Sequence, residues 1–156
     1  MPKAVVRLLL LGTAALTFGC ATSSRIRVEA PPLMRAALER AQDLIGTPYC
    51  SSGMTPDCFD CSGFVGYSFR DLFPTLPRTS SEMFLVGKHV DISDLQAGDL
   101  VFFSTSNRGT VNHVGIYLAD DRFIHSATSR GVMLSTLSEP YWKRRWKGAR
   151  RVTGTE

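Results

Sequence analysis

The sequence predicts an α+β domain in which N-terminal helices pack on an antiparallel β-sheet. Two observations support this fold class. Apolar residues with helical spacing and helix-capping signals occupy residues 31–87, whereas the chain after Gly98 contains five short runs of β-branched and aromatic residues separated by turn residues. Helices followed by a series of strands are typical of α+β proteins, because a parallel sheet needs alternating strands and helices. The 156 residues, of which 44% are hydrophobic, suit one domain with its own core.

The N-terminal residues are typical of an export signal. A basic start precedes the short apolar run "LLLLGTAALTF", and then Gly19 and Cys20 follow. A cysteine directly after a small residue indicates a bacterial lipoprotein, so we expect Cys20 to carry lipid after cleavage. The alternative, a buried N-terminal helix, is less consistent with the basic flank and with the polar "ATSSR" that follows.

These features divide the chain into three parts. We expect a signal peptide at residues 1–19, a lipidated cysteine and tether at residues 20–30, and the folded domain at residues 31–156. The protein would then lie in the bacterial cell envelope, on the periplasmic side, anchored to a membrane through its lipid. The residue after the cysteine is Ala21 and not an aspartate, which favours the outer membrane if the host is Gram-negative.

The first helix is expected to begin at Pro31, because proline suits a first helical turn, and to end at Gly46. Its apolar face is expected to comprise Leu33, Ala36, Ala37, Leu44 and Ile45. A loop rich in Gly, Ser, Pro and Cys follows at residues 46–60. The second helix is predicted to start at Cys61 with Asp60 as its N-cap, although Gly63 and Gly66 weaken its helical propensity.

A third short helix is marked by Thr79 and Glu82, which have the spacing of a capping box. After Gly98 the predicted strands are "DLVFFST", "VNHVGIYLA", "RFIHSA", "GVML" and "WKGARRV". The turn "ADDR" at residues 119–122 should join the second and third of these strands into a hairpin.

Six basic residues gather between Lys143 and Arg151. The favoured interpretation is a solvated strand edge that is protected by charge. A contact with anionic lipid or with an anionic wall polymer is the alternative. Nucleic acid is not an expected partner, because export places the protein away from it. Residues 20–156 also keep 16 of the 18 basic residues and all 14 acidic ones, a net charge of only +2.

The stretch "DCFDCSGFV" admits three kinds of chemistry. A zinc site is disfavoured, because Cys58 and Cys61 lack a second close pair of ligands. A redox pair has the right spacing but lacks the βαβ context of thioredoxin-like motifs. A nucleophilic thiolate at Cys61 would be favoured by the helix N-terminus, and His113 and His125 on paired strands could supply a base and an orienting group.

These same residues carry a family resemblance. "DCSGFV" (60–65), "NHVGIYL" (112–118) and "FIHSA" (123–127) resemble the NlpC-type cysteine peptidases of bacterial cell walls. Weaker similarities occur at "GTPY", "LPRTS", "GDLVFF", "GVML" and "ARRV", so the resemblance spans about residues 33–152 in the expected order.

The resemblance implies a papain-like fold with the nucleophile at a helix N-terminus. It implies Cys61 as nucleophile, His113 as base and His125 as the orienting group. It also implies that Tyr49 borders the oxyanion site and that Asp60 and Ser62 line the substrate cleft, with Asp60 reading the free amine of the stem peptide. The implied reaction is hydrolysis of peptidoglycan stem peptides, between D-glutamate and the following diamino acid, without a metal or cofactor.

The loop before the nucleophile departs from the family pattern. After "GTPY" the family continues with an aromatic residue and two glycines, whereas this chain reads "CSSGM". With Cys61 in catalysis and Cys20 in lipidation, we expect a Cys50–Cys58 disulfide in an oxidising periplasm. The rival is a regulatory Cys58–Cys61 bond.

Two other functions stay open at this stage. The same triad could act on another amide or ester, or the chain could be a non-catalytic lipoprotein that binds the envelope. The sequence does not identify protein partners.

Overall fold

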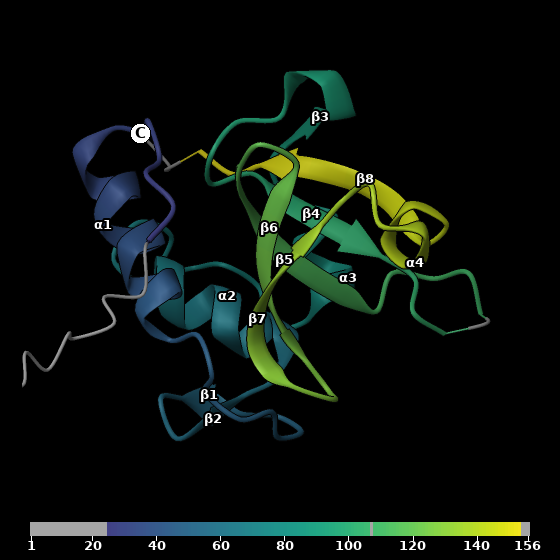
Figure 1. Ribbon diagram of the computed structural model, residues 1–156, viewed down its shortest axis with the longest axis horizontal. Helices are drawn as coiled ribbons and strands as arrows, with labels where there is room; N and C mark the ends of the chain where they lie inside the picture. Colours follow the sequence, from purple (N-terminus) through teal and green to yellow (C-terminus); the bar gives the residue numbers. More distant parts are fainter. Residues whose placement is uncertain (1–24, 107, 154–156) are drawn as a thin grey trace, which may run out of the picture.

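The computed structural model describes residues 25–106 and 108–153 and confirms the α+β class (Figure 1). Six antiparallel strands form one sheet in the order β3-β8-β4-β5-β6-β7. Their bounds are β3 (Lys88–Val90), β4 (Leu100–Phe103), β5 (His113–Ala119), β6 (Arg122–Ala127), β7 (Gly131–Thr136) and β8 (Trp146–Arg151). The helices are α1 (Pro32–Asp43), α2 (Cys61–Phe69), α3 (Ser80–Met83), α4 (Pro140–Lys143) and the 3-10 turn η1 (Ile92–Asp94). A separate two-stranded hairpin consists of β1 (Met54–Thr55) and β2 (Cys58–Phe59).

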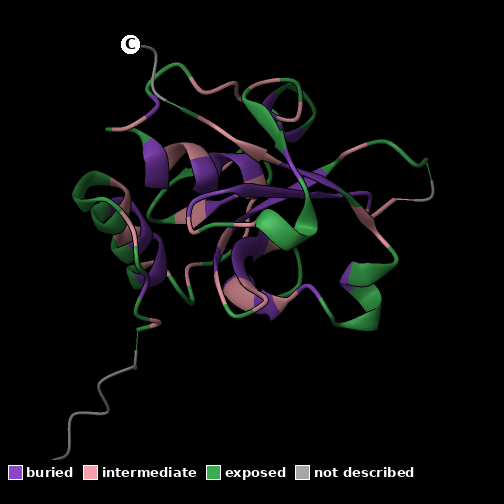
Figure 2. Cartoon of the chain, turned by 90° about the horizontal axis from the view of Figure 1, so that it is seen from above, coloured by how far each residue is buried: buried purple, intermediate pink, exposed green. Residues whose placement is uncertain are grey.

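The sheet has an apolar layer on each face, and most buried residues lie in α2 and the central strands (Figure 2). One layer joins α1 and α2 to the sheet through side chains such as Phe64, Phe102 and Ile116. The other layer, around Phe103 and Trp142, is covered by α4. Since alternate residues of a strand point to opposite faces, β5 contributes Val114, Ile116 and Leu118 to the helix side and His113 to the other side.

The buried face of α1 differs from the predicted one. Leu33 is 69% exposed and Ile45 is 43% exposed, whereas Leu38 and Ala41 are fully buried. Ala37 and Leu44 pack on the core as predicted, but the buried stripe runs through Ala37, Leu38 and Ala41, so the helix is rotated relative to the expected face. The expected stop near Gly46 is confirmed, since this residue has a φ of +92° in the turn after the helix.

The predicted helix starts of α2 and α3 are confirmed, and α1 begins at Pro32, one residue after the expected start. The Asp60 carboxylate accepts the Gly63 N–H at 2.6 Å and caps α2. Thr79 and Glu82 form both halves of the capping box at α3. All five predicted strands are present, while β3, α4 and the β1–β2 hairpin were not predicted.

Residues 25–30, which we expected within a tether, pack on α1. The Gln42 side chain accepts the Ile26 N–H at 2.7 Å and donates to the Ile26 carbonyl at 3.2 Å. Val28 is buried in the core, and Arg25 pairs with Asp43. We call residues 25–30 the N-terminal strap. Within the described residues no helix is long and apolar enough to cross a bilayer.

Candidate active site

The first residue of α2 carries the predicted nucleophile. Cys61 is the free cysteine of the described residues, and its thiol lies 4.0 Å from the carbonyl oxygen of Asn112. The backbone N–H of Val114 points at the same sulfur. The two backbone groups that flank His113 therefore both face Cys61, which places the thiol beside the start of β5.

The two predicted histidines are brought together by the β5–β6 hairpin. The imidazole Nε2 of His113 lies 2.9 Å from Nδ1 of His125, and both side chains are buried. Gly115 makes room for this pair, because a Cβ at that position would lie 2.7 Å from the Phe123 ring and 3.1 Å from the His125 Cβ.

Ser135 on β7 extends the pair into a chain of three side chains. This serine was not predicted from the sequence. Its hydroxyl lies 3.1 Å from Nε2 of His125. If His125 donates from Nε2 to Ser135, its Nδ1 must accept, and His113 must donate from its own Nε2. This tautomer leaves Nδ1 of His113 as the unprotonated nitrogen, the one that can receive a proton from Cys61.

Burial sets the protonation of these groups. Desolvation lowers the pKa of His113 to about 4 and, with the neighbouring His113, lowers the pKa of His125 to about 2. Burial also raises the pKa of the Cys61 thiol, despite donation from the Val114 N–H, and the Asp60 charge raises it further. Desolvation thus opposes the thiolate that the amides at the helix start favour, and these pKa shifts favour a neutral thiol and a neutral imidazole in the free site.

Asp60 is part of a polar cluster that includes an unpredicted arginine. Both of its oxygens accept from Arg78, at 3.1 and 2.6 Å, and Ser62 bonds to the same two residues. Burial raises the pKa of Asp60, but the Arg78 hydrogen bonds, the Gly63 N–H and the Arg78 charge together hold the pKa below its usual value. Arg78 lies within the "LPRTS" motif, and this motif was the sequence feature that could have identified it as a site residue. Its pairing across 18 residues depends on the tertiary fold.

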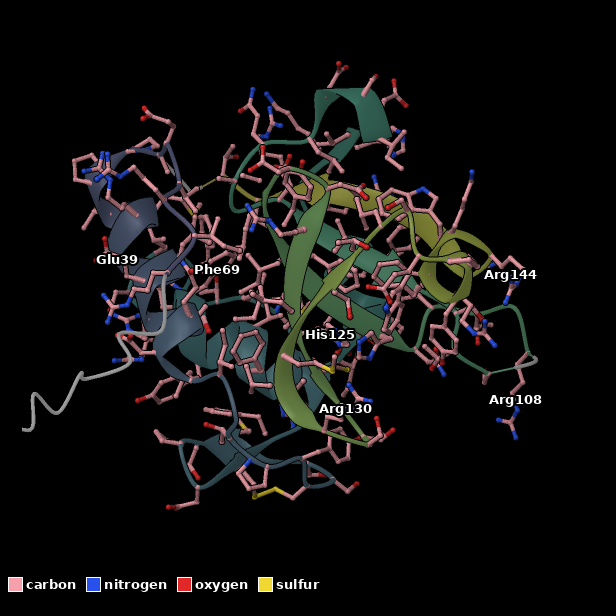
Figure 3. All side chains as sticks on the ribbon, in the orientation of Figure 1. Glu39, Phe69, Arg108, His125, Arg130 and Arg144 are labelled. Atoms are coloured by element: carbon pink, nitrogen blue, oxygen red, sulfur yellow. A yellow bond between two sulfur atoms is a disulfide. The ribbon has the colours of Figure 1, made fainter. Side chains whose placement is uncertain are left out.

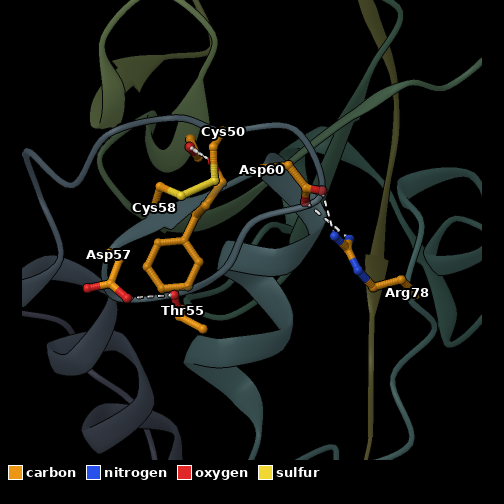
Figure 4. The surroundings of a disulfide bond; sticks show 8 residues. Cys50, Thr55, Asp57, Cys58, Asp60 and Arg78 are labelled. Carbon is orange, nitrogen blue, oxygen red and sulfur yellow. Dashed lines mark hydrogen bonds and ion pairs between the residues drawn. A yellow bond between two sulfur atoms is a disulfide. The ribbon is translucent and has the colours of Figure 1, made fainter.

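The loop before α2 holds Tyr49 and is closed by a disulfide between Cys50 and Cys58 (Figure 4). The structure thus has this bond and leaves Cys61 a free thiol. Tyr49 pairs with Phe59 in an isolated bridge. Burial raises the pKa of Tyr49, as do the charges of Cys61 and Asp60, so its phenol lies near both groups.

A cleft of about 550 Å³ adjoins the histidines on the side of α4. It runs between the β6–β7 turn and Trp142, and both His113 and His125 line it. His125 on β6 and Arg130 in the turn between β6 and β7 lie on the same side of the molecule (Figure 3). Among the residues that the structure describes, no three His, Cys, Asp or Glu side chains lie together as metal ligands would.

Comparison with known proteins gives the same assignment. The family model described as "NlpC/P60 family" matches residues 46–151. A "Probable endopeptidase" of Haemophilus influenzae is 41% identical over 124 residues, which cover 78% of this chain and 77% of that protein. The "Murein DD-endopeptidase MepS/Murein LD-carboxypeptidase" of Escherichia coli K12 is 44% identical over 116 residues, which cover 74% of this chain and 61% of that protein.

Solved structures agree with the sequence relatives. A Staphylococcus aureus structure described as similar to lipoprotein, NLP/P60 family, superposes with a TM-score of 0.72 at 34% identity. The superposition covers 83% of this chain and 44% of that one. The family match spans Tyr49, the start of α2, the histidine pair and Ser135, so the whole of the cysteine-histidine arrangement lies within it. The chain belongs to the NlpC/P60 family.

Proposed function

We propose that this protein is a peptidoglycan endopeptidase that hydrolyses amide bonds of stem peptides by acyl transfer. The single observation that carries the proposal is the placement of a free thiol at a helix start beside the His113–His125–Ser135 chain. Nucleophilic catalysis needs this order of groups: a nucleophile, a base, and a third group that orients the base. The names of the endopeptidase relatives support the substrate class.

In the proposed mechanism, the Cys61 sulfur attacks the amide carbonyl while its proton passes to Nδ1 of His113. The negative oxygen that forms is bonded by the Cys61 N–H, which has no partner within the first helical turn, and by Tyr49. One such donor is commonly worth about 3 kcal/mol of barrier. The His113 imidazolium then protonates the leaving amine, and water hydrolyses the thioester, which releases the peptide fragment as its carboxylic acid and restores the Cys61 thiol.

Asp60 and Ser62 are proposed to bind the amino end of the stem peptide. Because Arg78 already engages both Asp60 oxygens, the cluster offers an incoming ammonium group a carboxylate whose charge is partly balanced. We propose the bond between D-glutamate and the diamino acid as the one cleaved. The DD activity in the name of the Escherichia coli relative concerns a different bond of the same peptides, and the two produce different fragments.

The location of the protein is proposed from its N-terminal sequence. Residues 1–19 would be a signal peptide, Cys20 would carry lipid, and the domain would face the periplasm, with the outer membrane favoured in a Gram-negative host. These residues lie outside the described part of the chain. With the strap packed on α1, the proposed tether shortens to the residues between Cys20 and Arg25.

A digest of free stem peptides together with mixed muropeptides tests the function, because the amino end that Asp60 is proposed to bind is an ammonium group only in the free peptides. Purified protein and its Cys61→Ala variant are incubated with the substrate, with and without reductant, and the products are identified by mass. We expect new dipeptide and tripeptide fragments from the parent alone, which would identify both the bond and the nucleophile. Absence of cleavage under both conditions would remove the endopeptidase proposal, and equal cleavage by the variant would remove Cys61 as nucleophile.

A further inference from the structure

The basic residues of the α4–β8 region form two sets with different surroundings. Arg150 donates to the Phe84 carbonyl at 2.7 Å, and Arg151 pairs with Asp99, so these two hold the fold together. The other set faces solvent and, within the described residues, takes part in no ion pair. It comprises Lys143, Arg144, Arg145 and Lys147.

A solvated strand edge does not account for this second set. β8 lies between β3 and β4 in the sheet and is therefore an interior strand, which corrects the interpretation favoured from the sequence. Lys143, Arg144 and Arg145 precede β8, on α4 and in the turn after it. Their charge does not protect a free row of backbone groups.

The solvent-facing set borders a hollow of about 370 Å³, which we call the basic groove. The groove is lined by Ser104, Thr105, Ser106, Gly109, Arg144, Arg145 and Lys147. Its wall is fixed by internal contacts, since the Ser104 N–H donates to the Arg145 carbonyl at 2.8 Å. The Arg145 guanidinium stacks 3.8 Å above the Tyr141 ring. Hydroxyl groups and three cations around one hollow suit a ligand with several anionic oxygens.

The basic groove adjoins the cleft beside His113 and His125. Thr105 lines both hollows, and Tyr141, the partner of Arg145, lines the cleft. The Thr105 N–H donates to the Asn112 side chain at 2.7 Å, and the Asn112 carbonyl lies 4.0 Å from the Cys61 sulfur. A polymer whose peptide occupies the cleft would therefore reach the groove a short distance beyond the histidines.

The position of the basic groove favours a wall polymer over a membrane surface as its ligand. α1, with the N-terminal strap on it, and α4 lie at opposite ends of the long axis of the molecule (Figure 1). Figure 3 accordingly places Glu39 of α1 at one end and Arg108 and Arg144 at the other. A membrane anchor attached before the strap would lie at the end of the molecule opposite to the basic groove.

We propose that the basic groove binds the peptidoglycan polymer itself, through carboxylates of stem peptides that neighbour a cross-linked stem peptide whose amino end has been freed from the glycan strand and can meet Asp60. This inference rests on the proposed function and adds a polymer-binding surface to it. Free stem peptides carry several carboxylates, so the charges are complementary, and attraction between exposed charges falls with added salt. The groove would raise affinity for the polymer without taking part in the chemical step.

Pelleting with insoluble peptidoglycan tests the proposal independently of cleavage. The full chain in detergent, in a Cys61→Ala background that leaves the polymer intact, is compared with the same chain carrying R144E and K147E. We expect binding to weaken about tenfold in about 0.05 M salt, and the difference to vanish near 1 M, where the Debye length is about 3 Å. Equal binding by both proteins at low salt would overturn the proposal.

A matched control removes the effect of net charge. R27E and R35E at the α1 end change the charge by the same amount and should leave binding to peptidoglycan unchanged. A loss as large as that of R144E and K147E would overturn a local groove. The same proteins are also mixed with anionic phospholipid vesicles. If R144E and K147E weaken binding to these vesicles but not to peptidoglycan, the proposal is overturned as well.

Kinetics then separate this inference from the proposed function. With active Cys61, R144E and K147E should raise the KM for polymer and leave kcat/KM for a soluble single stem peptide within about twofold of the parent. A large loss on the soluble peptide would place these residues within the cleft and overturn the proposal. Failure of the parent to cleave either substrate would remove the endopeptidase function, while the pelleting result would stand on its own.

Discussion

The resting protonation of Cys61 follows from burial more than from the helix that begins there. A thiol at a helix start is stabilised as thiolate by nearby N–H groups, but removal from water opposes the charge. His113 is likewise held neutral, with its pKa lowered to about 4. In the proposed mechanism, proton transfer from sulfur to imidazole would therefore accompany the attack on substrate, because these pKa shifts disfavour an ion pair before it.

This resting state predicts the pH dependence of Cys61 alkylation. Because the pKa of the thiol is raised, the reactive thiolate is scarce at neutral pH, and its fraction grows as pH rises toward that pKa. We expect the iodoacetamide rate, followed at the Cys61 peptide by mass, to climb continuously between about pH 6 and pH 9. In Asp60→Asn the alkylation rate should begin to rise at a lower pH, since the Asp60 charge raises the thiol pKa. A plateau of high reactivity from pH 5 to 8 would instead reveal a preformed ion pair.

Ser135 is predicted to act as a positioning residue. Ser135→Ala removes the hydroxyl that lies within hydrogen-bond distance of Nε2 of His125, so a proton on that nitrogen loses its acceptor and the tautomer that leaves Nδ1 of His113 free loses this support. We expect kcat to fall about tenfold, equivalent to about 1.4 kcal/mol of barrier, with KM little changed. Ser135→Thr keeps the hydroxyl and should restore kcat. If both variants lose activity equally, with a parallel loss of thermal stability, the role of Ser135 is structural only.

The residues that the sequence identified differ in kind from those it missed. Cys61, His113 and His125 carry chemistry that few other residue types supply, and each stands in a short motif. Ser135 and Arg78 are common residue types whose roles depend on which side chain the fold places beside them. Ser135 meets His125 across the β6–β7 pair, and Arg78 returns to Asp60 from a loop after α2.

At the scale of elements, the close contact between α2 and the disulfide-closed loop explains a glycine that helical propensity disfavours. A Cβ on Gly63 would collide with the backbone carbonyl of Gly53, and that carbonyl accepts the Asp60 N–H at 3.1 Å. A Cβ on Gly66, one turn further along, would enter open space with no atom within 4 Å. The two helical glycines therefore differ in what surrounds them, and only Gly63 is required by a close approach.

Alanine substitutions at the two glycines should have opposite effects. Gly66→Ala should stabilise the protein by up to about 1 kcal/mol, because alanine is the better helix former. Gly63→Ala should destabilise it by about 1–3 kcal/mol, since the loop and α2 must move apart. Thermal unfolding of both variants measures this difference. Equal stabilisation by both would mean that the loop does not press on the helix.

Elements with a strong local signal were predictable, whereas β3 and α4 were not. β4, β5 and β6 are rich in β-branched and aromatic residues, and the caps of α2 and α3 have strong sequence signals. β3 has three residues and α4 has four, too few to show a period. The face of α1 was misjudged because small residues pack against α2, which leaves Leu33 exposed.

At the scale of the whole molecule, the N-terminal strap makes residues 25–30 part of the folded domain. Its attachment depends on Gln42, whose amide satisfies both backbone groups of Ile26, and on burial of Val28. The strap thereby joins the N-terminal part of the described chain to the same core that supports α2.

Gln42→Ala is predicted to release the strap. Two hydrogen bonds are lost and the Ile26 backbone must find water, a cost of about 1–2 kcal/mol. We expect faster tryptic cleavage after Arg27 and a Tm lower by about 2–8 °C. Glu39→Ala, on the exposed side of the same helix, is the matched control and should change neither. Unchanged proteolysis of Gln42→Ala would show that apolar burial alone holds the strap.

The strap also sets a length. If Cys20 carries lipid as proposed, only about five peptide steps separate the anchor from Arg25, and an extended chain covers about 3.5 Å per residue. The tether is then at most about 18 Å long, and a domain of this size is about 35–40 Å across. An anchored molecule would work within a shell about 55 Å deep beside its membrane. Wall strands inside that shell can be cut, and those outside it must wait until growth or bending of the wall brings them closer.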